Sequence, residues 1–129
     1  MKKLFLLFNH KFTPEQEADA RASLEVEEIV ELPPDLARLW RQIPADMSEI
    51  GDFLEPVRQW LARESVAGDA ALIQGDFGAC ALMVEYARER GLVPVYSTTE
   101  RKAREETLPD GSVRMSHQFK HTLFRKYGE

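Results

Sequence analysis

Three adjacent side chains near the N-terminus, Asn9, His10 and Lys11, could act together on a phosphate-containing ligand. The ordinary pKa of histidine is about 6.5, so His10 could serve as a general base or a general acid near neutral pH. Lys11 could neutralise a phosphate, and the Asn9 amide could both donate and accept hydrogen bonds. The alternatives are structural. His10 could cap the next helix or bond a carbonyl, Lys11 could be solvated, and Asn9 could only form a turn.

A second candidate site is the glycine-containing stretch Gln74-Gly75-Asp76-Phe77-Gly78. Its two glycines permit a sharp turn from an apolar run into a helix, and such a turn presents main-chain N–H groups that suit an anion. Gln74 could read an adenine edge or a ribose hydroxyl, Asp76 could orient a ribose or cap the helix, and Phe77 could stack on a base or anchor the core. The alternative is a turn that binds nothing, because no complete G-x-G-x-x-G is present.

Residues 76–78 also spell Asp-Phe-Gly, the tripeptide with which protein kinases hold magnesium. A kinase requires in addition a glycine-rich loop, a strand lysine, and a catalytic-loop Asp and Asn. None of these patterns occurs in the 129 residues, so the kinase interpretation is excluded.

Polar and basic side chains of the last third of the chain could extend such a site. The candidates are Thr98, Thr99, Arg101, Lys120 and Arg125. For each basic side chain taken singly, a solvated hairpin face is the alternative. Cys80 is the only cysteine and the histidines form no i, i+4 pair on an expected helix, so the sequence predicts neither a metal site nor a cofactor.

Apolar runs, glycines and prolines divide the chain into alternating strands and helices. A capping box of Thr13 and Gln16, with proline between them, predicts the start of the first helix. Pro109-Asp110-Gly111 predicts a hairpin turn. The expected strands are Lys3–Phe8, Glu27–Leu32, Ala70–Gln74, Leu92–Thr98 and a hairpin of residues 100–108 and 112–126; the expected helices run from Thr13 to Leu24, from Asp35 to Trp40, from Ser48 to Leu61 with Pro56 kinking or dividing it, and from Ala79 to Arg90.

This alternation predicts an α/β fold with a mostly parallel, Rossmann-like sheet, flanking helices and a C-terminal β-hairpin. Right-handed crossovers favour the strand order 2-1-3-4, which makes strands one and three neighbours. Ligands of open α/β sheets bind where two such strands lead the chain in opposite directions. The loop of residues 9–11, the turn of residues 74–78 and the end of the fourth strand are therefore expected to meet at one edge.

Length, composition and charge limit the classes of protein to which the chain can belong. The 129 residues, 43% of them hydrophobic and 30% charged, predict one domain over residues 1–129 with residues 100–127 as a hairpin extension. A single cysteine and no long apolar segment indicate a cytoplasmic protein that does not span a membrane. The net charge of −5 argues against long nucleic acid as a partner. Residues 99–129 carry 7 Lys/Arg against 5 Asp/Glu, a local +2 that suits a small anion.

Four segments together resemble a small family of CRISPR-associated accessory proteins of type III systems. They read KLFLLFNHKFTPEQ, LIQGDFGA, GLVPVYSTTER and FKHTLFRKYGE, and the resemblance extends from Met1 to Glu129. The family is related to the CRISPR-associated Rossmann-fold (CARF) sensors and includes stand-alone ring nucleases.

The resemblance implies a homodimer that binds cyclic oligoadenylate, most often the tetramer, at the carboxyl ends of its strands. A ring nuclease cleaves this messenger without metal through a ribose 2′-hydroxyl and so ends the antiviral response. In such a site His10 would transfer a proton, Lys11 would stabilise the phosphate charge, and His121 would be a second candidate for proton transfer. Two alternatives remain open: a sensor or sponge that binds the ring without cleaving it, and a structural accessory protein of a CRISPR complex.

Overall fold

The computed structural model describes residues 1–101, 103–116 and 119–129, and its strands and helices alternate along the chain as the sequence predicts. In chain order the elements are β1 (Lys3–Leu7), α1 (Pro14–Ser23), β2 (Glu28–Glu31), α2 (Pro34–Arg41), the 3₁₀-helix η1 (Asp52–Leu54), α3 (Glu55–Glu64), β3 (Ala70–Ile73), α4 (Phe77–Glu89), β4 (Val93–Thr107) and β5 (Val113–Lys126).

The strands form one sheet in the order β2-β1-β3-β4-β5. The first four strands of this order pair in parallel, and β5 adds to β4 in the antiparallel sense. The predicted α/β class, the mostly parallel sheet and the order of its first four strands are confirmed. Strands β1 and β3 are neighbours, with Leu4 opposite Ala70 and Leu7 opposite Ile73, so the chain leaves both strands at the same edge.

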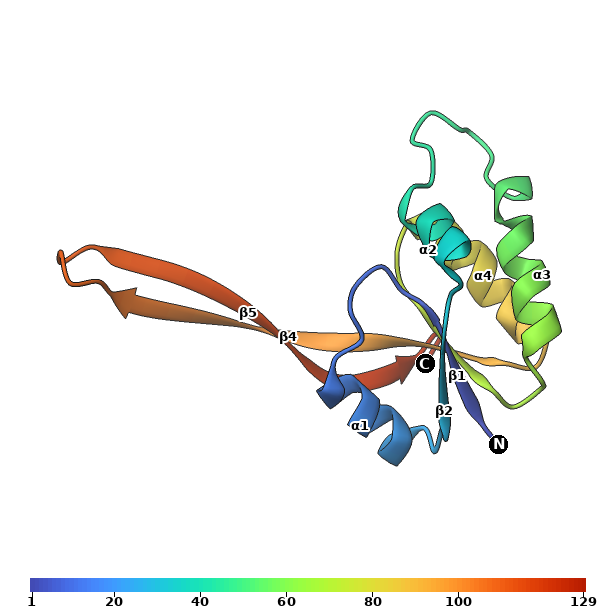
Figure 1. The fold of residues 1–129 in the computed structure, drawn as a ribbon, viewed down its shortest axis with the longest axis horizontal. Coiled ribbons are helices and arrows are strands. Elements are labelled where there is room, and N and C mark those ends of the chain that lie inside the picture. Colours follow the sequence, from blue (N-terminus) through green and yellow to red (C-terminus); the bar gives the residue numbers. More distant parts are fainter.

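Helices cover the two faces of the sheet unequally (Figure 1). Helices α2, α3 and α4 lie on one face, where Phe5 and Leu7 of β1 belong to their apolar cluster. Helix α1 lies on the other face, where Leu4 and Leu6 point toward it. Strand residues alternate between the faces, so a continuous apolar run is what a strand buried on both sides requires.

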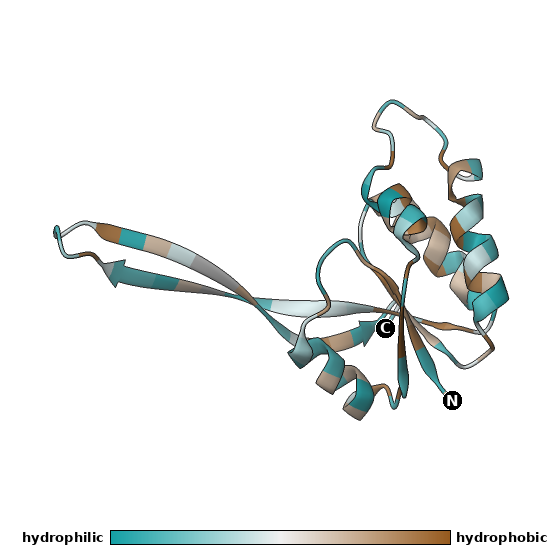
Figure 2. Cartoon of the chain, viewed as in Figure 1, coloured by the Kyte–Doolittle hydropathy of each residue, from teal (hydrophilic) through white to brown (hydrophobic). Residues whose placement is uncertain are grey.

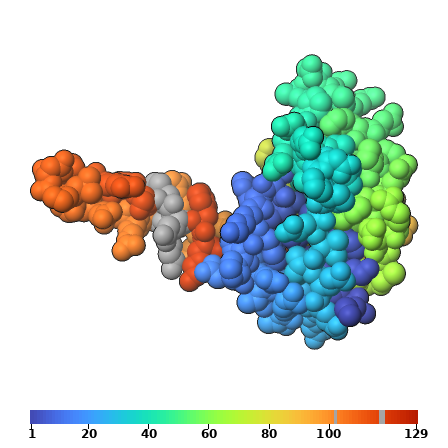
Figure 3. Space-filling model, in the orientation of Figure 1, coloured from blue at the N-terminus to red at the C-terminus, as the bar shows by residue number. Residues whose placement is uncertain are grey.

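Strands β4 and β5 continue beyond the body as a long two-stranded arm (Figures 1 and 3). The predicted strand Leu92–Thr98 and the predicted hairpin segment 100–108 are therefore one strand, and predicting two separate elements was wrong. Pairing runs from Val95 opposite Lys126 to Thr107 opposite Val113, with a shift in register between Thr98 and Thr99. Because Thr98 pairs with Leu123 and Thr99 pairs with His121, Thr122 is the extra residue of a bulge.

Two further expectations were wrong. The start at Ser48 was wrong, because the helical structure begins only at Asp52 with η1. The alternative that the helix is divided is confirmed: α3 follows from Glu55, and Pro56 lies in its first turn, where its missing N–H costs nothing. Asp35 does not cap α2, which begins one residue earlier at Pro34 with no side-chain cap. In contrast, the capping box of α1 is confirmed in both of its hydrogen bonds.

The central strands of the body consist largely of apolar residues, whereas the helices and the arm combine apolar and polar residues (Figure 2). Among the helices of the described residues, none combines the length and the hydropathy needed to cross a lipid bilayer.

Candidate functional site

The N-terminal loop and the glycine turn meet at the edge where β1 and β3 end. The Gln74 N–H donates to the Leu7 carbonyl at 3.0 Å, and the indole of Trp40 donates to the Gln74 carbonyl at 3.0 Å. A Cβ atom on Gly75 would lie 3.0 Å from the Trp40 indole nitrogen and 3.3 Å from the Asn9 amide nitrogen. The close approach of Trp40 and Asn9 thus favours glycine at position 75.

A cavity with a volume of about 480 Å³ opens beside this edge, on the face of the sheet that α1 covers. It is lined by Phe8, His10, Lys11, Thr13, Gln16, Gln74, Ser97, Thr99 and Phe119. His10 and Lys11 are exposed to solvent, and Phe119 on the arm is 70% exposed. The cavity therefore combines two exposed nitrogen-bearing side chains, several hydroxyl and amide groups and one free aromatic face.

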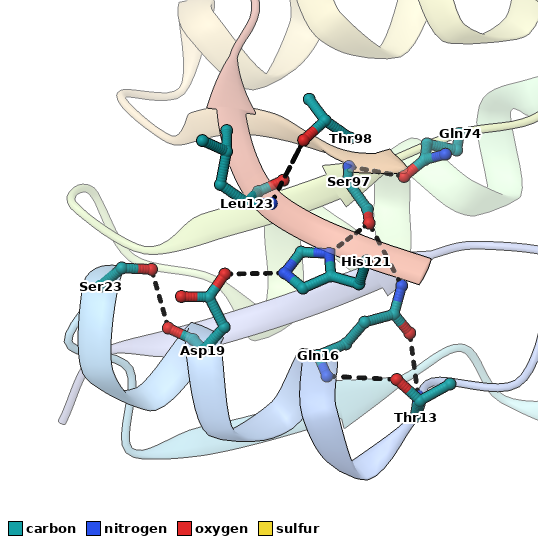
Figure 4. A network of polar contacts seen from close by, with 9 residues as sticks. All are labelled: Thr13, Gln16, Asp19, Ser23, Gln74, Ser97, Thr98, His121 and Leu123. Carbon is teal, nitrogen blue, oxygen red and sulfur yellow. Dashed lines mark hydrogen bonds and ion pairs between the residues drawn. The ribbon is translucent and has the colours of Figure 1, made fainter. Parts of the chain in front are cut away.

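A polar network lies behind the wall of this cavity, and three of its members, Gln16, Gln74 and Ser97, line the cavity itself (Figure 4). Ser97 Oγ lies 2.6 Å from His121 Nδ1, and His121 Nε2 lies 2.7 Å from Asp19 Oδ2. Gln16 Nε2 donates to Ser97 Oγ at 3.3 Å, and the Ser97 N–H donates to Gln74 Oε1 at 2.8 Å. These contacts join α1, β4, β5 and the turn after β3, so they hold the base of the arm against the body.

The sequence-predicted residues divide among three cavities around the edge. His10, Lys11, Gln74 and Thr99 share the cavity on the α1 face. Asn9 lies in a second cavity of about 360 Å³ toward β2, which His10 and Lys11 also line. Gly75 and Phe77 line a third cavity of about 660 Å³ on the face of α4, with Gln74 shared between the first and the third. His10 and Lys11 therefore lie between two of the cavities.

The N-terminus of α4 is already occupied by a carboxylate. Asp76 Oδ2 accepts a hydrogen bond from the Ala79 N–H at 3.0 Å, so the capping alternative for Asp76 is confirmed. An exposed negative charge at this position opposes the binding of a phosphate there, and the expected cradle of main-chain N–H groups up to Gly78 is weakened accordingly. Phe77 is 95% exposed, so it does not anchor the core.

The structure does not bring the other predicted residues into the cavity on the α1 face. The Thr98 hydroxyl donates to the Leu123 carbonyl at 3.1 Å within the bulge. Arg125 donates to the Tyr96 hydroxyl at 2.9 Å, beside the cavity on the α4 face. Arg101 pairs with Phe119 on the arm, and Lys120 pairs with Glu100 on the opposite face of the ribbon. The His121 side chain is only 6% exposed and does not line the cavity.

Several residues of the site were not singled out from the sequence. Ser97 falls within the predicted strand Leu92–Thr98 but was assigned no role, and Gln16 was interpreted only as part of a helix cap. Asp19 and Phe119 were not selected at all. A serine within the apolar segment that begins β4 is a signal that could have been used, because a buried hydroxyl needs partners. In the described part of the chain, no group of three or more His, Cys, Asp or Glu side chains is arranged to hold a metal ion.

Two side chains that line the cavity on the α4 face have raised pKa values. Partial burial is the main cause that raises the pKa of Tyr127 to about 12, and the nearby Cys80 adds to it. The Tyr127 hydroxyl donates to the Ile73 carbonyl at 2.5 Å, which ties the end of β5 to β3. Burial also raises the pKa of the Cys80 thiol, which disfavours the thiolate that a nucleophilic cysteine needs.

Tyr127 should make the fold sensitive to alkali. In the unfolded chain tyrosine ionises near pH 10, whereas the folded side chain stays neutral until about pH 12. The neutral Tyr127 side chain therefore contributes fully to the free energy of unfolding below pH 10. This contribution is lost progressively as the pH rises toward 12. We expect Tyr127→Phe to reduce the fall in unfolding free energy over this interval, measured by urea denaturation at successive pH values. Tyr86→Phe, the matched control, should retain the fall of the wild type; an equal fall in Tyr127→Phe would contradict this assignment.

Comparison with known proteins identifies the family of the chain. No solved structure matches it. The chain is 45% identical over 127 residues to a protein of Methanocaldococcus jannaschii named "Uncharacterized protein MJ1673", and the match covers 98% of each chain. A family model described as "Uncharacterized protein MJ1673 family" matches residues 2–125. The chain therefore belongs to the MJ1673 family.

Proposed function

We propose that this protein is a ring nuclease that binds cyclic oligoadenylate and cleaves it in the cavity on the α1 face. One observation carries the proposal: the exposed side chains of Lys11 and His10 share a cavity at the ends of β1 and β3 with an exposed aromatic ring, Phe119. The lysine can bind the phosphate, the histidine can transfer a proton during cleavage, and the aromatic ring can stack on a base, so together they suit a ribonucleotide phosphodiester. The resemblance to the type III CRISPR accessory family supports the same ligand.

The lining of the cavity suits a nucleotide unit. Lys11 can neutralise a phosphate, and the hydroxyl of Thr99 can bond a ribose. Phe119 presents a free face on which a base can stack, an interaction typically worth about 1–3 kcal/mol per base. We also class the sheet as Rossmann-like, because this cavity lies where β1 and β3 lead the chain in opposite directions.

A ring of four nucleotides calls for a second copy of the chain. A cavity of about 480 Å³ is in the range of one small-ligand site, so the ring would occupy two such cavities related by a two-fold axis. The outer part of the arm offers a contact surface, because Val113 and Met115 are exposed and lie on one face of β5. An isolated two-stranded ribbon is marginally stable in water, so covering this face by a partner would stabilise it. We therefore propose a homodimer.

Cleavage needs alignment more than a set of strong nucleophiles. The ligand's own 2′-hydroxyl attacks the adjacent phosphorus, the bond from phosphorus to the 5′-oxygen breaks, and a 2′,3′-cyclic phosphate and a 5′-hydroxyl result. Holding the attacking oxygen in line with the leaving oxygen supplies up to about 7–11 kcal/mol of the barrier in favourable cases. Lys11 would stabilise the phosphate charge, and His10 would donate a proton to the leaving 5′-oxygen.

The test is a cleavage assay under single-turnover conditions. Excess protein is incubated with labelled cyclic tetra-adenylate in EDTA, the products are resolved by chromatography, and binding is measured by calorimetry. We expect linear products that end in a 2′,3′-cyclic phosphate, and a chromatographic mass of two chains.

The other outcomes identify the alternatives. Binding with an intact ring after long, stoichiometric incubation would contradict cleavage and indicate a sensor or sponge. No measurable affinity would contradict the ligand itself and favour a structural accessory protein of a CRISPR complex.

A further inference from the structure

The three side chains Ser97, His121 and Asp19 form a continuous hydrogen-bonded chain that ends in the cavity. They come from β4, β5 and α1 and are separated by 2.6 Å and 2.7 Å (Figure 4). His121 is almost completely buried, and Asp19 is 28% exposed. Ser97 is the one member that lines the cavity. These hydrogen bonds therefore connect Ser97, in the ligand cavity, through the imidazole of His121 to the carboxylate of Asp19.

The direction of each hydrogen bond follows from the chemistry of the partners. A carboxylate only accepts, so His121 Nε2 carries the hydrogen that bonds Asp19. In the neutral ring Nδ1 is then the acceptor, and the Ser97 hydroxyl donates to it. The serine oxygen in turn accepts from Gln16 Nε2. The capping box fixes the orientation of this amide, because Gln16 Oε1 accepts from the Thr13 N–H at 2.9 Å.

We propose that Ser97, His121 and Asp19 form a proton relay that deprotonates the attacking hydroxyl of the ligand; this inference rests on the proposed function. As the ligand's 2′-oxygen bonds to phosphorus, its proton passes to Ser97 Oγ while the serine proton passes to His121 Nδ1. The Asp19 carboxylate stabilises the resulting imidazolium. Ser97 is the catalytic residue of the relay because it touches the ligand, and His121, Asp19 and Gln16 act through it as positioning residues.

Proton transfer fits the geometry better than attack by the serine itself. Serine hydrolases use the same three side chains, but there Nε2 faces the serine and Nδ1 faces the carboxylate. Here the ring is reversed. Ser97 is only 7% exposed, and its oxygen is held by both Gln16 and His121. A hydroxyl held in this way can exchange protons with a ligand hydroxyl without leaving its place.

Asp19→Asn tests the relay with almost no change in shape. An asparagine can donate an N–H to His121 Nε2, which moves the ring hydrogen to Nδ1 and removes the acceptor for the Ser97 proton. We expect this variant and Ser97→Ala to lower the single-turnover cleavage rate by about a hundredfold, while the Kd for cyclic tetra-adenylate stays close to wild type. The Tm should stay close to wild type in Asp19→Asn, whereas Ser97→Ala should lower it, because Gln16 Nε2 and His121 Nδ1 lose their partner. Arg21→Ala, which breaks the exposed pair with Glu17 on the same helix, is the matched control and should cleave at the wild-type rate.

The loss of cleavage at unchanged Kd is the readout that a merely structural contact would not predict, and a nitrogen-15 NMR spectrum of His121 tests the hydrogen-bond directions that the relay requires. We expect hydrogen on Nε2 and none on Nδ1 in the wild type, and the reverse in Asp19→Asn. Wild-type cleavage by Asp19→Asn and Ser97→Ala, or a wild-type ring with hydrogen on Nδ1, would overturn the relay and leave the proposed function standing. A wild-type protein that neither binds nor cleaves the ring overturns both.

Discussion

Trp40→Ala is expected to lower the free energy of unfolding by about 3–5 kcal/mol, the usual cost of removing a buried tryptophan. Trp40 is 1% exposed, belongs to the larger apolar cluster, and donates its indole N–H to the Gln74 carbonyl. The side chain thus packs α2 against the turn that begins one wall of the candidate site. The free energy of unfolding of a whole domain is typically only about 5–15 kcal/mol, so this one substitution should remove a large part of the stability. Urea denaturation followed by tryptophan fluorescence or circular dichroism measures it.

Two further variants show how much of this loss comes from the packing of Trp40, how much from its hydrogen bond to Gln74, and how much from the turn itself. Trp40→Phe keeps most of the apolar volume but leaves the Gln74 carbonyl without its donor, so a smaller loss of about 1 kcal/mol is expected. Phe77→Ala removes a 95% exposed ring beside the same turn, and its effect should stay within about 0.5 kcal/mol. A Trp40→Ala protein as stable as Phe77→Ala would show that α2 does not support this edge.

The body of the fold was predictable because its local signals agree with one another. Ala70–Ile73 is a short apolar run that is buried throughout, as a strand covered on both faces must be. The Thr13–Gln16 capping box and the Asp76 cap define where α1 and α4 begin. Helix α3 was misplaced because an apolar periodicity over residues 50–61 outweighed the proline signal, although proline is most compatible with the first turn of a helix.

The arm and the relay were not predictable for the same physical reason. A polar stretch after Thr98 indicates the end of a buried strand, whereas β4 continues outward with only β5 to pair with it. The bulge at Thr122 then decides which β5 side chains face α1, and a one-residue shift would turn His121 away from Ser97 and Asp19. His121 and Asp19 are 102 residues apart in the sequence, and no local pattern of residues predicts a contact at such a separation. The loops around His10 and Gln74 were predictable because strand order alone brings them together.

Lys11→Ala is expected to lower single-turnover cleavage of cyclic tetra-adenylate by at least about tenfold, which corresponds to about 1.4 kcal/mol of barrier. The exposed Lys11 ammonium lies on the cavity with His10, so it is placed to hold a phosphate of the ring. Lys11→Glu should have a larger effect, about a hundredfold, because it also repels the phosphate. His10→Ala should lose at least about tenfold as well, if it protonates the leaving oxygen.

Lys120 provides the matched control, because it is an exposed lysine near the same edge that the sequence also suggested as a ligand contact. It follows Phe119 in β5, and since successive strand residues point to opposite faces, it lies on the side of the ribbon away from the α1 cavity. Lys120→Ala should therefore cleave at the wild-type rate. If Lys120→Ala cleaves more slowly while Lys11→Ala cleaves at the wild-type rate, the proposed site is wrong. The ring then binds and is cleaved in the cavity on the α4 face, beside Arg125 and Tyr96.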